Sequence, residues 1–517
     1  MPNLIIDGNS LTIEKVCAFA FDESIKVSLS DACYKGINKA AQAVERFIQS
    51  DSVVYGITTG FGALKNTIIP KDQVGKLQKN ILLSHSVGVG PKLDVPTTRA
   101  MMLIRANTLA RGHSGIKLET LELLLKLLNL GIYPLIPEKG SLGASGDLAP
   151  LAHMALPLIG LGEVQFKGDF MPAAEALNRC GLQAINLCAK EGLALTNGTS
   201  FMSAMGAILT VKAKKLLKIA DLSGSLVLEA LNGTLKAFDP RIHALRPHKG
   251  QQVTADNFLK ILDKSTFVRE YDPLNIQDAY TLRCIPQVHG AIRDTVEFCS
   301  RVFEIEINSV TDNPLIFFDQ DNKAEILSGG NFHGEPLAFA MDYLAIAMTD
   351  LGNMIERRIA KLVDESNNQH LLPPFLIKNS GVNSGFMLIQ YTAAALASEN
   401  KVLSHPSSTD SVPSSANVED HVSMGANACL HARAVLDNLA TILSLELLSA
   451  AQAIDFRISS TYGNQMLGMG TRKLFQAIRE EVPFIENDSQ MSTFIEKIQG
   501  LVAGPILENI FDELIRG

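Results

Sequence analysis

Apolar residues recur at intervals of three and four along much of the chain, and this spacing predicts long helices that each bury one face. The clearest stripe lies within residues 336–362 and consists of Leu337, Met341, Leu344, Met348, Leu351, Ile355 and Ile359. Further helices are predicted at 117–128, 200–231, 386–403 and 424–453, the second of them as one helix or as two joined near Ser223 and Gly224. Strand patterns are short and fall at 4–6, 164–166 and 315–318. The predicted fold class is therefore mainly α.

The segments between these helices are rich in Gly, Asn, Ser and Pro, which favour turns. Short polar loops on a rigid scaffold are where functional groups tend to lie. We predict a partly irregular N-terminal region over 1–192, which carries a reactive loop and a lid, followed by a long central and C-terminal helical bundle over 193–517. The two parts are expected to form one compact unit.

The composition indicates a large core and an unusually uncharged surface. Of 517 residues, 46% are hydrophobic and 19% are charged, which is below the roughly 25% of soluble domains. Long helices with so few charges are suited to packing against copies of themselves, so we predict a homo-oligomer. The net charge of −8 argues against nucleic acid or an anionic membrane as the main partner.

The cysteines and the apolar segments indicate the cellular location of the protein. Seven cysteines form no C-x-x-C pair, and their odd number favours reduced thiols. The N-terminus lacks a basic start followed by a long apolar run, so no signal peptide is visible. The longest uncharged stretch, 192–211, contains too many Thr, Ser and Asn residues for a membrane span. The sequence therefore predicts a soluble, cytoplasmic protein without a membrane partner.

The loop 140–151 contains three consecutive residues, Ala144, Ser145 and Gly146, that can turn themselves into an electrophile. The Gly146 nitrogen is uncrowded because glycine has no Cβ. If it attacks the Ala144 carbonyl carbon, a five-membered ring closes across Ser145. Loss of two waters, one of them from the Ser145 hydroxyl, then leaves a conjugated methylene. The alternatives are a glycine-rich loop that only turns the chain and a serine-hydrolase elbow, but Asp147 stands where that elbow needs its last Gly.

The stretch 140–155 resembles, position by position, the cofactor motif of the aromatic amino-acid ammonia-lyases, which carry a 4-methylidene-imidazole-5-one group (MIO). The resemblance covers nearly the whole chain, from Tyr55 to past Met424. It implies that Ala144, Ser145 and Gly146 form the MIO group autocatalytically and that no dissociable cofactor is needed. It also implies a mostly helical subunit, a homotetramer, and active sites assembled from loops of three subunits.

Five residues are predicted around such a group, each in a loop-like segment or at a helix turn. Tyr55 and Gly62 bound a segment with three glycines in eight residues, which reads as a mobile lid or as a tyrosine packed on a turn. The resemblance implies that it is the catalytic lid. Asn197 reads first as an Asn-Gly turn and Phe332 as core. The resemblance implies that Asn197 binds the MIO ring and the substrate and that Phe332 packs beside the ring. Asp147 either orients the loop during cyclisation or caps the helix that starts there.

Gln277, Tyr280 and Arg283 are spaced three apart, which predicts that all three lie on one face of a helical turn. An arginine suits a substrate carboxylate because its fork makes two parallel hydrogen bonds. Tyr280 is then the predicted base for the β-proton, since the nearby charge of Arg283 favours the ionised phenol. The alternative for Arg283 alone is a surface salt bridge.

His85 and Glu419 indicate which amino acid is the substrate. A carboxylate can accept the N–H of an imidazole and stabilise its protonated form, while a second histidine bonds the other side. A benzyl group would instead leave a buried Glu unpaired, at a cost of several kcal/mol. Histidine-specific members of the resembling family carry Ser-His and Glu-Asp-His at these places. The resemblance therefore implies L-histidine as substrate, with Glu419 also in a catalytic role, and trans-urocanate and ammonia as products of the first step of histidine degradation.

Two positions depart from the histidine-specific pattern: Val418 stands where many such members have Gln, and Thr58 replaces a common Asn. The alternatives are therefore a phenylalanine or tyrosine lyase or an aminomutase of the same family, and a non-catalytic helical scaffold. A scaffold would need none of the reactive residues. No metal motif is apparent, because His243 and His248 stand five apart beside Arg and Pro and no H-E-x-x-H occurs.

Overall fold

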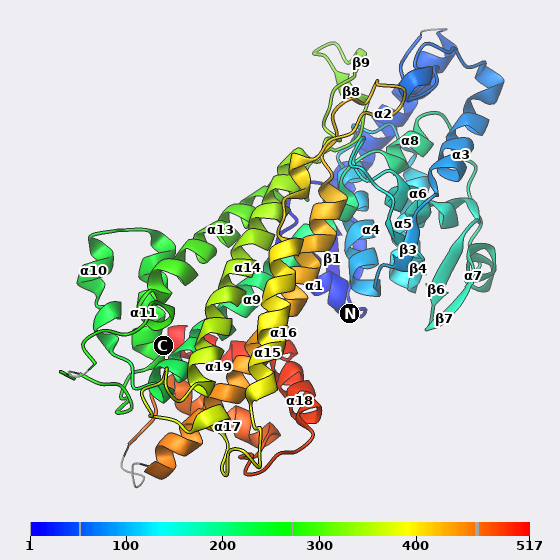
Figure 1. Ribbon diagram of the computed structural model, residues 1–517. Coiled ribbons are helices and arrows are strands. Elements are labelled where there is room, and N and C mark those ends of the chain that lie inside the picture. Colours follow the sequence, from blue (N-terminus) through cyan, green and yellow to red (C-terminus); the bar gives the residue numbers. More distant parts are fainter. Residues whose placement is uncertain (1, 51–52, 271, 274, 461–464, 517) are drawn as a thin grey trace. The chain divides into compact units, whose positions relative to one another are not determined.

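The computed structural model describes residues 2–50, 53–270, 272–273, 275–460 and 465–516 (Figure 1). The chain forms two compact units. Unit 1 comprises Met1–Val211, Cys299–Asp342 and Pro406–Leu430, and unit 2 comprises Lys212–Phe298, Tyr343–His405 and His431–Gly517. The predicted division at residue 192 stays a prediction. The first break between the two compact units follows Val211, and the segments 299–342 and 406–430 belong to the same unit as the N-terminal part.

The predicted mainly α class is confirmed. Unit 1 contains the helices α1 (Ile13–Phe21), α2 (Asp31–Gln49), α3 (Val74–His85), α4 (Val95–Ala110), α5 (Leu118–Leu130), α6 (Ala149–Ala155), α7 (Ala173–Arg179) and α8 (Glu191–Thr196). Short 3-10 turns of this unit are η1 (Gly62–Leu64), η2 (Lys71–Gln73), η3 (Leu156–Ile159) and η6 (Ser407–Thr409). Four of the five breaks between the units fall inside helices, which are α9 (Ser200–Ala230), α13 (Ile285–Glu306), α14 (Glu335–Val363) and α16 (Gly425–Ser460). The fifth break lies between His405 and Pro406, outside the helices.

The strands of unit 1 are short. β1 (Asn3–Ile6) pairs in parallel with β2 (Lys26–Leu29), and the remaining pairs are antiparallel. They are β3 (Val89–Lys92) with β5 (Pro137–Lys139), β6 (Glu163–Phe166) between β4 (Ile132–Pro134) and β7 (Asp169–Pro172), and β8 (Leu315–Phe318) with β9 (Ala324–Leu327). The three predicted strands are confirmed as parts of β1, β6 and β8. Their partners were missed because runs of three or four residues carry too little alternation to be recognised.

Unit 2 contains the remaining described helices: α10 (Pro240–Ala244), α11 (Lys249–Ile261), α12 (Tyr280–Arg283), α15 (Met387–Leu403), α17 (Met469–Glu481), α18 (Met491–Ala503) and α19 (Ile506–Arg516), with the 3-10 turns η4 (Leu235–Phe238) and η5 (Pro374–Leu376). Within it, α14, α15 and α16 run side by side (Figure 1). A buried ion pair joins α14 to α16: Arg358 of α14 donates to both carboxylate oxygens of Glu446 of α16, at 2.6 and 3.1 Å.

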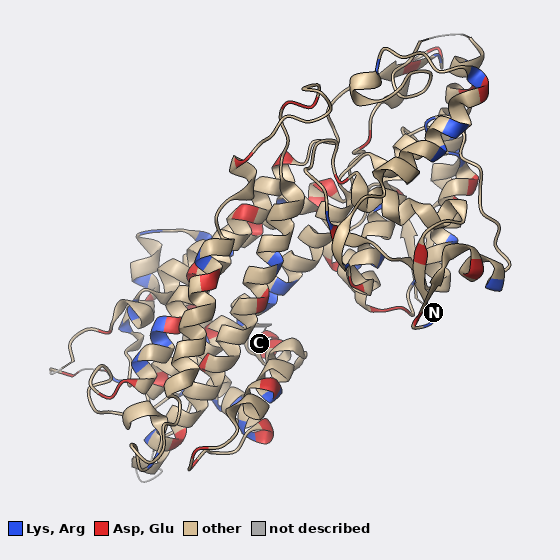
Figure 2. Cartoon of the chain, turned by 45° about the vertical axis from the view of Figure 1, so that its right-hand side comes forward, with Lys and Arg blue, Asp and Glu red and all other residues tan. Residues whose placement is uncertain are grey.

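The long helices form where the apolar stripes predict them. All seven stripe residues of α14 are fully buried, because their spacing keeps them on one face. α9 is one continuous helix and Ser223 and Gly224 lie inside it. α16 is long and apolar enough to cross a membrane, but 72% of its apolar window is buried inside the protein, as is typical of a core helix. Acidic and basic residues are interspersed along both units (Figure 2).

α4 supports the backbone near Asn197 through one buried arginine. Its N-cap is Asp94, whose carboxylate accepts the Thr97 N–H at 2.8 Å, and nearly all of its residues are buried. Two arginines, Arg99 and Arg105, are buried with it at 1% and 0% exposure. A buried guanidinium needs several acceptors, so each of these side chains ties other segments of unit 1 to α4.

Candidate active site

A cavity of about 430 Å³ in unit 1 collects most of the predicted site residues. It is lined by Tyr55, Phe61, Gly62, Lys65, Ile81, His85, Ser145, Leu148, Leu193, Asn197, Asn313, Ser328, Gly329, Phe332, Val418 and Glu419. The volume falls in the range of roughly 300 to 1,000 Å³ that small-molecule sites occupy. Loops that lie far apart along the chain therefore meet at one place, with Ser145 among the residues that line it.

The backbone around Ser145 is held by the turn at Asn197. The Ser145 carbonyl oxygen accepts two hydrogen bonds, one from Asn197 Nδ2 at 3.0 Å and one from the Gly198 N–H at 3.2 Å. The Asp147 N–H in turn donates to the Gly198 carbonyl at 2.6 Å. Two preorganised donors on one carbonyl oxygen stabilise negative charge that develops there.

Gly146 could not be replaced without disturbing this arrangement. Its φ is +77°, and a Cβ at this position would lie 2.1 Å from the Gly198 carbonyl oxygen. An isolated β-bridge also pairs Ala144 with Gly146, so the tripeptide is folded back on itself. The residue that the cyclisation chemistry needs for its uncrowded nitrogen is thus also the residue that the backbone geometry requires.

Asp147 caps a different helix from the one that the sequence suggested. Its carboxylate accepts the N–H groups of Phe201 at 2.6 Å and Met202 at 3.3 Å, in the first turn of α9. α6, which follows Asp147 in the chain, begins after Leu148 without a side-chain cap, so the capping prediction for α6 is wrong. Complete burial raises the pKa of Asp147 to about 7, although the two N–H groups act to lower it.

Arg105, which the sequence analysis did not single out, supports the Asn197 turn from α4. Its Nη2 donates to the Asn197 carbonyl at 2.8 Å and to the Ala194 carbonyl. Burial lowers its pKa, while the charges of Asp312 and Asp147 raise it. The available signal was the apolar run 100–106 of α4, in which Arg105 is the single charged residue, which indicates burial with partners.

The lid segment lies against the chain near Ser415. The Tyr55 hydroxyl oxygen accepts the Gly62 N–H at 3.4 Å, and the Ser415 hydroxyl accepts the Ala63 N–H at 3.1 Å. Gly62 has a φ of +54°, and a Cβ there would lie 2.4 Å from the Ser415 hydroxyl. Thr58 accepts the Val54 N–H at 2.8 Å with its hydroxyl, so it supports the turn of the lid and is not among the cavity-lining residues.

Glu419 and His85 line the same cavity. Oε2 of Glu419 accepts from the Ser414 hydroxyl at 3.1 Å, and Oε1 lies 3.5 Å from the Ser145 hydroxyl. His85 ends α3, and its Nδ1 pairs with the Ser84 hydroxyl at 3.0 Å. Burial lowers the pKa of His85, although the charge of Glu419 acts to raise it. A neutral imidazole and a carboxylate can thus each present one hydrogen-bonding atom to a bound molecule.

Gln277, Tyr280 and Arg283 belong to unit 2, and none of the three lines the cavity of unit 1. The prediction of one shared helical turn is wrong for Gln277, because α12 begins only at Tyr280. The three side chains nevertheless meet. The Arg283 guanidinium lies 4.8 Å from the centre of the Tyr280 ring, and Gln277, with its amide oxygen turned toward Arg283, accepts from Nη2 at 2.6 Å. Tyr280 is 71% exposed.

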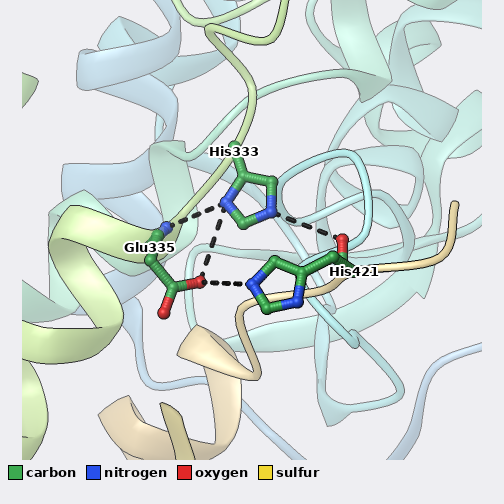
Figure 3. Close-up of side chains that lie close together, drawn as sticks. All are labelled: His333, Glu335 and His421. Atoms are coloured by element: carbon green, nitrogen blue, oxygen red, sulfur yellow. Dashed lines mark hydrogen bonds and ion pairs between the residues drawn. The ribbon is translucent and has the colours of Figure 1, made fainter. Parts of the chain in front are cut away.

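Three side chains of types that can bind a metal also lie together, and the sequence analysis did not single them out. His333, Glu335 and His421 bring one ligand atom each to within 4.8 Å of one another (Figure 3). The sequence showed no metal motif because the two histidines stand 88 positions apart. The short run His333-Gly334-Glu335 was the one feature of the sequence that could have indicated a metal site.

Comparison with known proteins agrees with this geometry. A sequence model described as aromatic amino acid lyase matches residues 11–480. A histidine ammonia-lyase from Chloroflexus aurantiacus is 58% identical over 502 residues, which cover 97% of this chain and 96% of the relative. A crystal structure of histidine ammonia-lyase from Trypanosoma cruzi superposes with a TM-score of 0.90 at 40% identity, over 99% of this chain and 95% of that one. A tyrosine aminomutase from Streptomyces globisporus has a TM-score of 0.90 at 37% identity, over 100% of this chain and 98% of that one. The chain therefore belongs to the aromatic amino acid lyase family.

Proposed function

We propose that this chain is a carbon–nitrogen lyase that converts L-histidine to trans-urocanate and ammonia. The observation that carries the proposal is the shared cavity of Ser145, His85 and Glu419, with Glu419 Oε1 only 3.5 Å from the Ser145 hydroxyl. A carboxylate at this place is matched by an imidazole N–H and would be left unpaired by a phenyl ring. The high identity to proteins named histidine ammonia-lyase supports the same substrate.

The family generally depends on an MIO group, and the residues of this chain fit one. Ala144, Ser145 and Gly146 are present, the Ser145 carbonyl already has two donors, and the Cα of Gly146 faces backbone that leaves no room for a side chain. We propose that these three residues form it. The group supplies an electrophile that takes up the amino group of the substrate, a capacity that side chains lack.

The other residues of the cavity would bind and orient the substrate. Asn197 Oδ1 is buried and has no hydrogen-bond partner among the described residues, so it offers a free acceptor beside the Ser145 carbonyl. We assign it to the substrate amino group, Glu419 and His85 to the imidazole, and Phe332 to packing beside the reactive ring. We assign Tyr55 on the lid to give or take a proton once the cavity is closed.

We further propose a homotetramer in which Gln277, Tyr280 and Arg283 of other copies complete each site. The family resemblance supports this, and so does the exposed side chain of Tyr280 beside Arg283. In this arrangement Arg283 holds the substrate carboxylate and Tyr280 removes the β-proton. We also propose that the protein is cytoplasmic, which agrees with its seven free cysteines. The reaction would be the first step of histidine degradation.

Shared sites can be tested by complementation. Ser145→Ala and Arg283→Ala chains should each be inactive alone, whereas co-expression should restore part of the activity, because some sites then receive intact residues from both copies. No recovery in mixed oligomers, shown to be mixed by two affinity tags, would contradict the sharing. A monomer in light scattering at micromolar concentration would contradict the oligomer itself.

The substrate is tested by incubating the purified protein separately with L-histidine, L-phenylalanine and L-tyrosine while the ultraviolet absorbance of a conjugated acid is followed. We expect a rise with L-histidine alone and none with the Ser145→Ala variant. A rise with an aromatic substrate instead would keep the reaction class and refute the assignment of Glu419. Chromatography for a β-amino acid product identifies an aminomutase.

A further inference from the structure

We propose that His333, Glu335 and His421 form a binding site for a divalent transition-metal ion of the zinc class. Figure 3 shows the three side chains converging, with one oxygen of Glu335 facing both imidazoles. Nδ1 of His333 lies 3.8 Å from Glu335 Oε2, and Nε2 of His421 lies 3.9 Å from the same oxygen. The two rings are nearly parallel, at 9°, with their centres 5.8 Å apart.

The carboxylate oxygen at the centre of this group lacks a partner. Distances of 3.8 and 3.9 Å are too long for hydrogen bonds, and Glu335 Oε2 is buried without a hydrogen bond from any described residue. A buried anionic oxygen in that condition is costly. An ion bound tetrahedrally at roughly 2.0–2.1 Å would hold its ligand atoms about 3.3 Å apart. The two pairs that include Glu335 Oε2 reach that separation by closing about half an ångström. The two imidazole nitrogens, which lie within 4.8 Å of each other, must close by up to about 1.5 Å, which requires the exposed His421 ring to turn toward His333. The ion would neutralise the carboxylate.

The surroundings orient His333 for this role. Its Nε2 pairs with the His421 carbonyl at 3.4 Å, which fixes the tautomer with the proton on Nε2. Nδ1 then keeps its lone pair, which now accepts the Glu335 N–H through a long contact of 3.3 Å. In metal-binding histidines, the ring nitrogen that does not hold the ion usually donates its N–H to a backbone carbonyl or a carboxylate. An ion would replace only the long contact at Nδ1.

The ligand set decides the class of ion. Two imidazoles and one carboxylate suit Zn²⁺, Co²⁺, Mn²⁺ or Fe²⁺, whereas Ca²⁺ and Mg²⁺ prefer oxygen ligands and Cu⁺ prefers sulfur. Three protein ligands leave a position for water. The His421 side chain is 68% exposed, so an ion can enter from solvent.

The site lies beside residues that line the cavity, so a bound ion should affect substrate binding. This inference rests on the proposed function. His333 follows Phe332 directly, and His421 stands two residues after Glu419, both of which line the cavity. An ion held by both histidines would tie together the two segments that carry the ring-packing residue and the imidazole-binding residue. We therefore expect the bound ion to lower the KM for L-histidine more than it changes kcat.

Metal binding is measured directly on the full-length protein after treatment with EDTA. Isothermal titration with ZnCl2 should show one site per chain, and the Glu335→Gln and His421→Gln variants should bind at least tenfold more weakly. His370→Gln is the matched control, because His370 Nδ1 lies 3.7 Å from Glu365 Oε1 and no further metal-binding side chain of the described residues joins this pair. It should bind like the parent. Equal affinity in all four proteins, or no stoichiometric uptake by the parent, would overturn the proposal.

Two further measurements, of melting temperature and of the visible spectrum with cobalt, separate metal binding from folding and from enzyme activity. All variants should show the parent's circular dichroism and melting temperature in EDTA, and Zn²⁺ should raise the melting temperature of the parent and the control only. With CoCl2 the parent should give the visible bands of a tetrahedral ion without the thiolate charge-transfer band that cysteine ligands would produce. Zn²⁺ binding without histidine turnover would support this site and contradict the proposed function.

Discussion

Glu419→Gln is the substitution that tests the reading of the substrate pocket most sharply. Oε2 of Glu419 is already engaged by the Ser414 hydroxyl at 3.1 Å, while Oε1 faces Ser145 at 3.5 Å. A glutamine can keep the bond from Ser414 with its amide oxygen. Its NH2 group then takes the place of Oε1, and an NH2 group only donates. The substitution therefore removes the one acceptor that the carboxylate offers to the cavity.

The size of the effect follows from this exchange. A hydrogen bond to a charged group contributes roughly 1.5–3 kcal/mol, and a buried donor left without an acceptor costs roughly 1–3 kcal/mol. The two figures describe the same lost interaction and are not added, so we expect a loss of about 1–3 kcal/mol, which lowers kcat/KM for L-histidine by about 5- to 150-fold. A ligand with a phenyl ring has no N–H at this place, so its binding should stay within about a factor of three or improve, since the neutral amide is less costly to desolvate.

The assay compares two acids that differ only in the ring. Inhibition constants for trans-urocanate and trans-cinnamate are measured on the parent and the variant, together with kcat/KM for L-histidine. Asp420→Asn is the control, because it removes the same charge at the next, exposed position. The binding of trans-urocanate should weaken in the Glu419→Gln variant alone. Equal losses for both acids would show that Glu419 serves the common chemistry and would refute the pocket argument.

Three other predictions concern the reactive loop and the buried charges. Ser145→Ala should abolish turnover of L-histidine with an unchanged melting curve, because no hydroxyl remains to be lost; near-normal turnover contradicts this. Arg358→Leu should lower the free energy of unfolding by roughly 3–5 kcal/mol, since Glu446 is left buried and unpaired, whereas Arg357→Leu, at a 63% exposed side chain, should cost at most about 1 kcal/mol. Equal shifts in denaturant midpoint would refute the difference. The pKa of Asp147 rises from 3.8 to about 7 on folding, so folding takes up a proton and the parent loses stability as the pH rises from 4 to 7. The melting temperature of Asp147→Asn minus that of the parent should therefore grow over this window, and a flat difference would count against it.

Helices could be predicted, and a candidate reactive loop could be located, because their signals are local. The stripe of α14 specifies which face is buried whatever lies against it, and all seven of its residues are buried. The same holds for the loop at Ser145, whose chemistry depends on three consecutive residues. The residues predicted at Tyr55, His85, Asn197 and Glu419 do meet in one cavity of unit 1.

Contacts between distant segments could not be predicted in this way. Asp147 precedes α6 but caps α9, because a carboxylate binds the nearest free N–H groups in space rather than along the chain. Arg105 reaches the Asn197 carbonyl across 92 positions, and His333 meets His421 across 88. Nothing in the spacing of single residues specifies such pairs, since they depend on how the helices pack.

The mass of the proteolytic peptide that contains Ser145 tests the central claim most directly. If Ala144, Ser145 and Gly146 form the electrophile, this peptide from the active parent protein should be lighter than its sequence requires by two water molecules, and the corresponding Ser145→Ala peptide should not have lost the water of a hydroxyl. A peptide of full mass in protein that deaminates L-histidine would contradict the account.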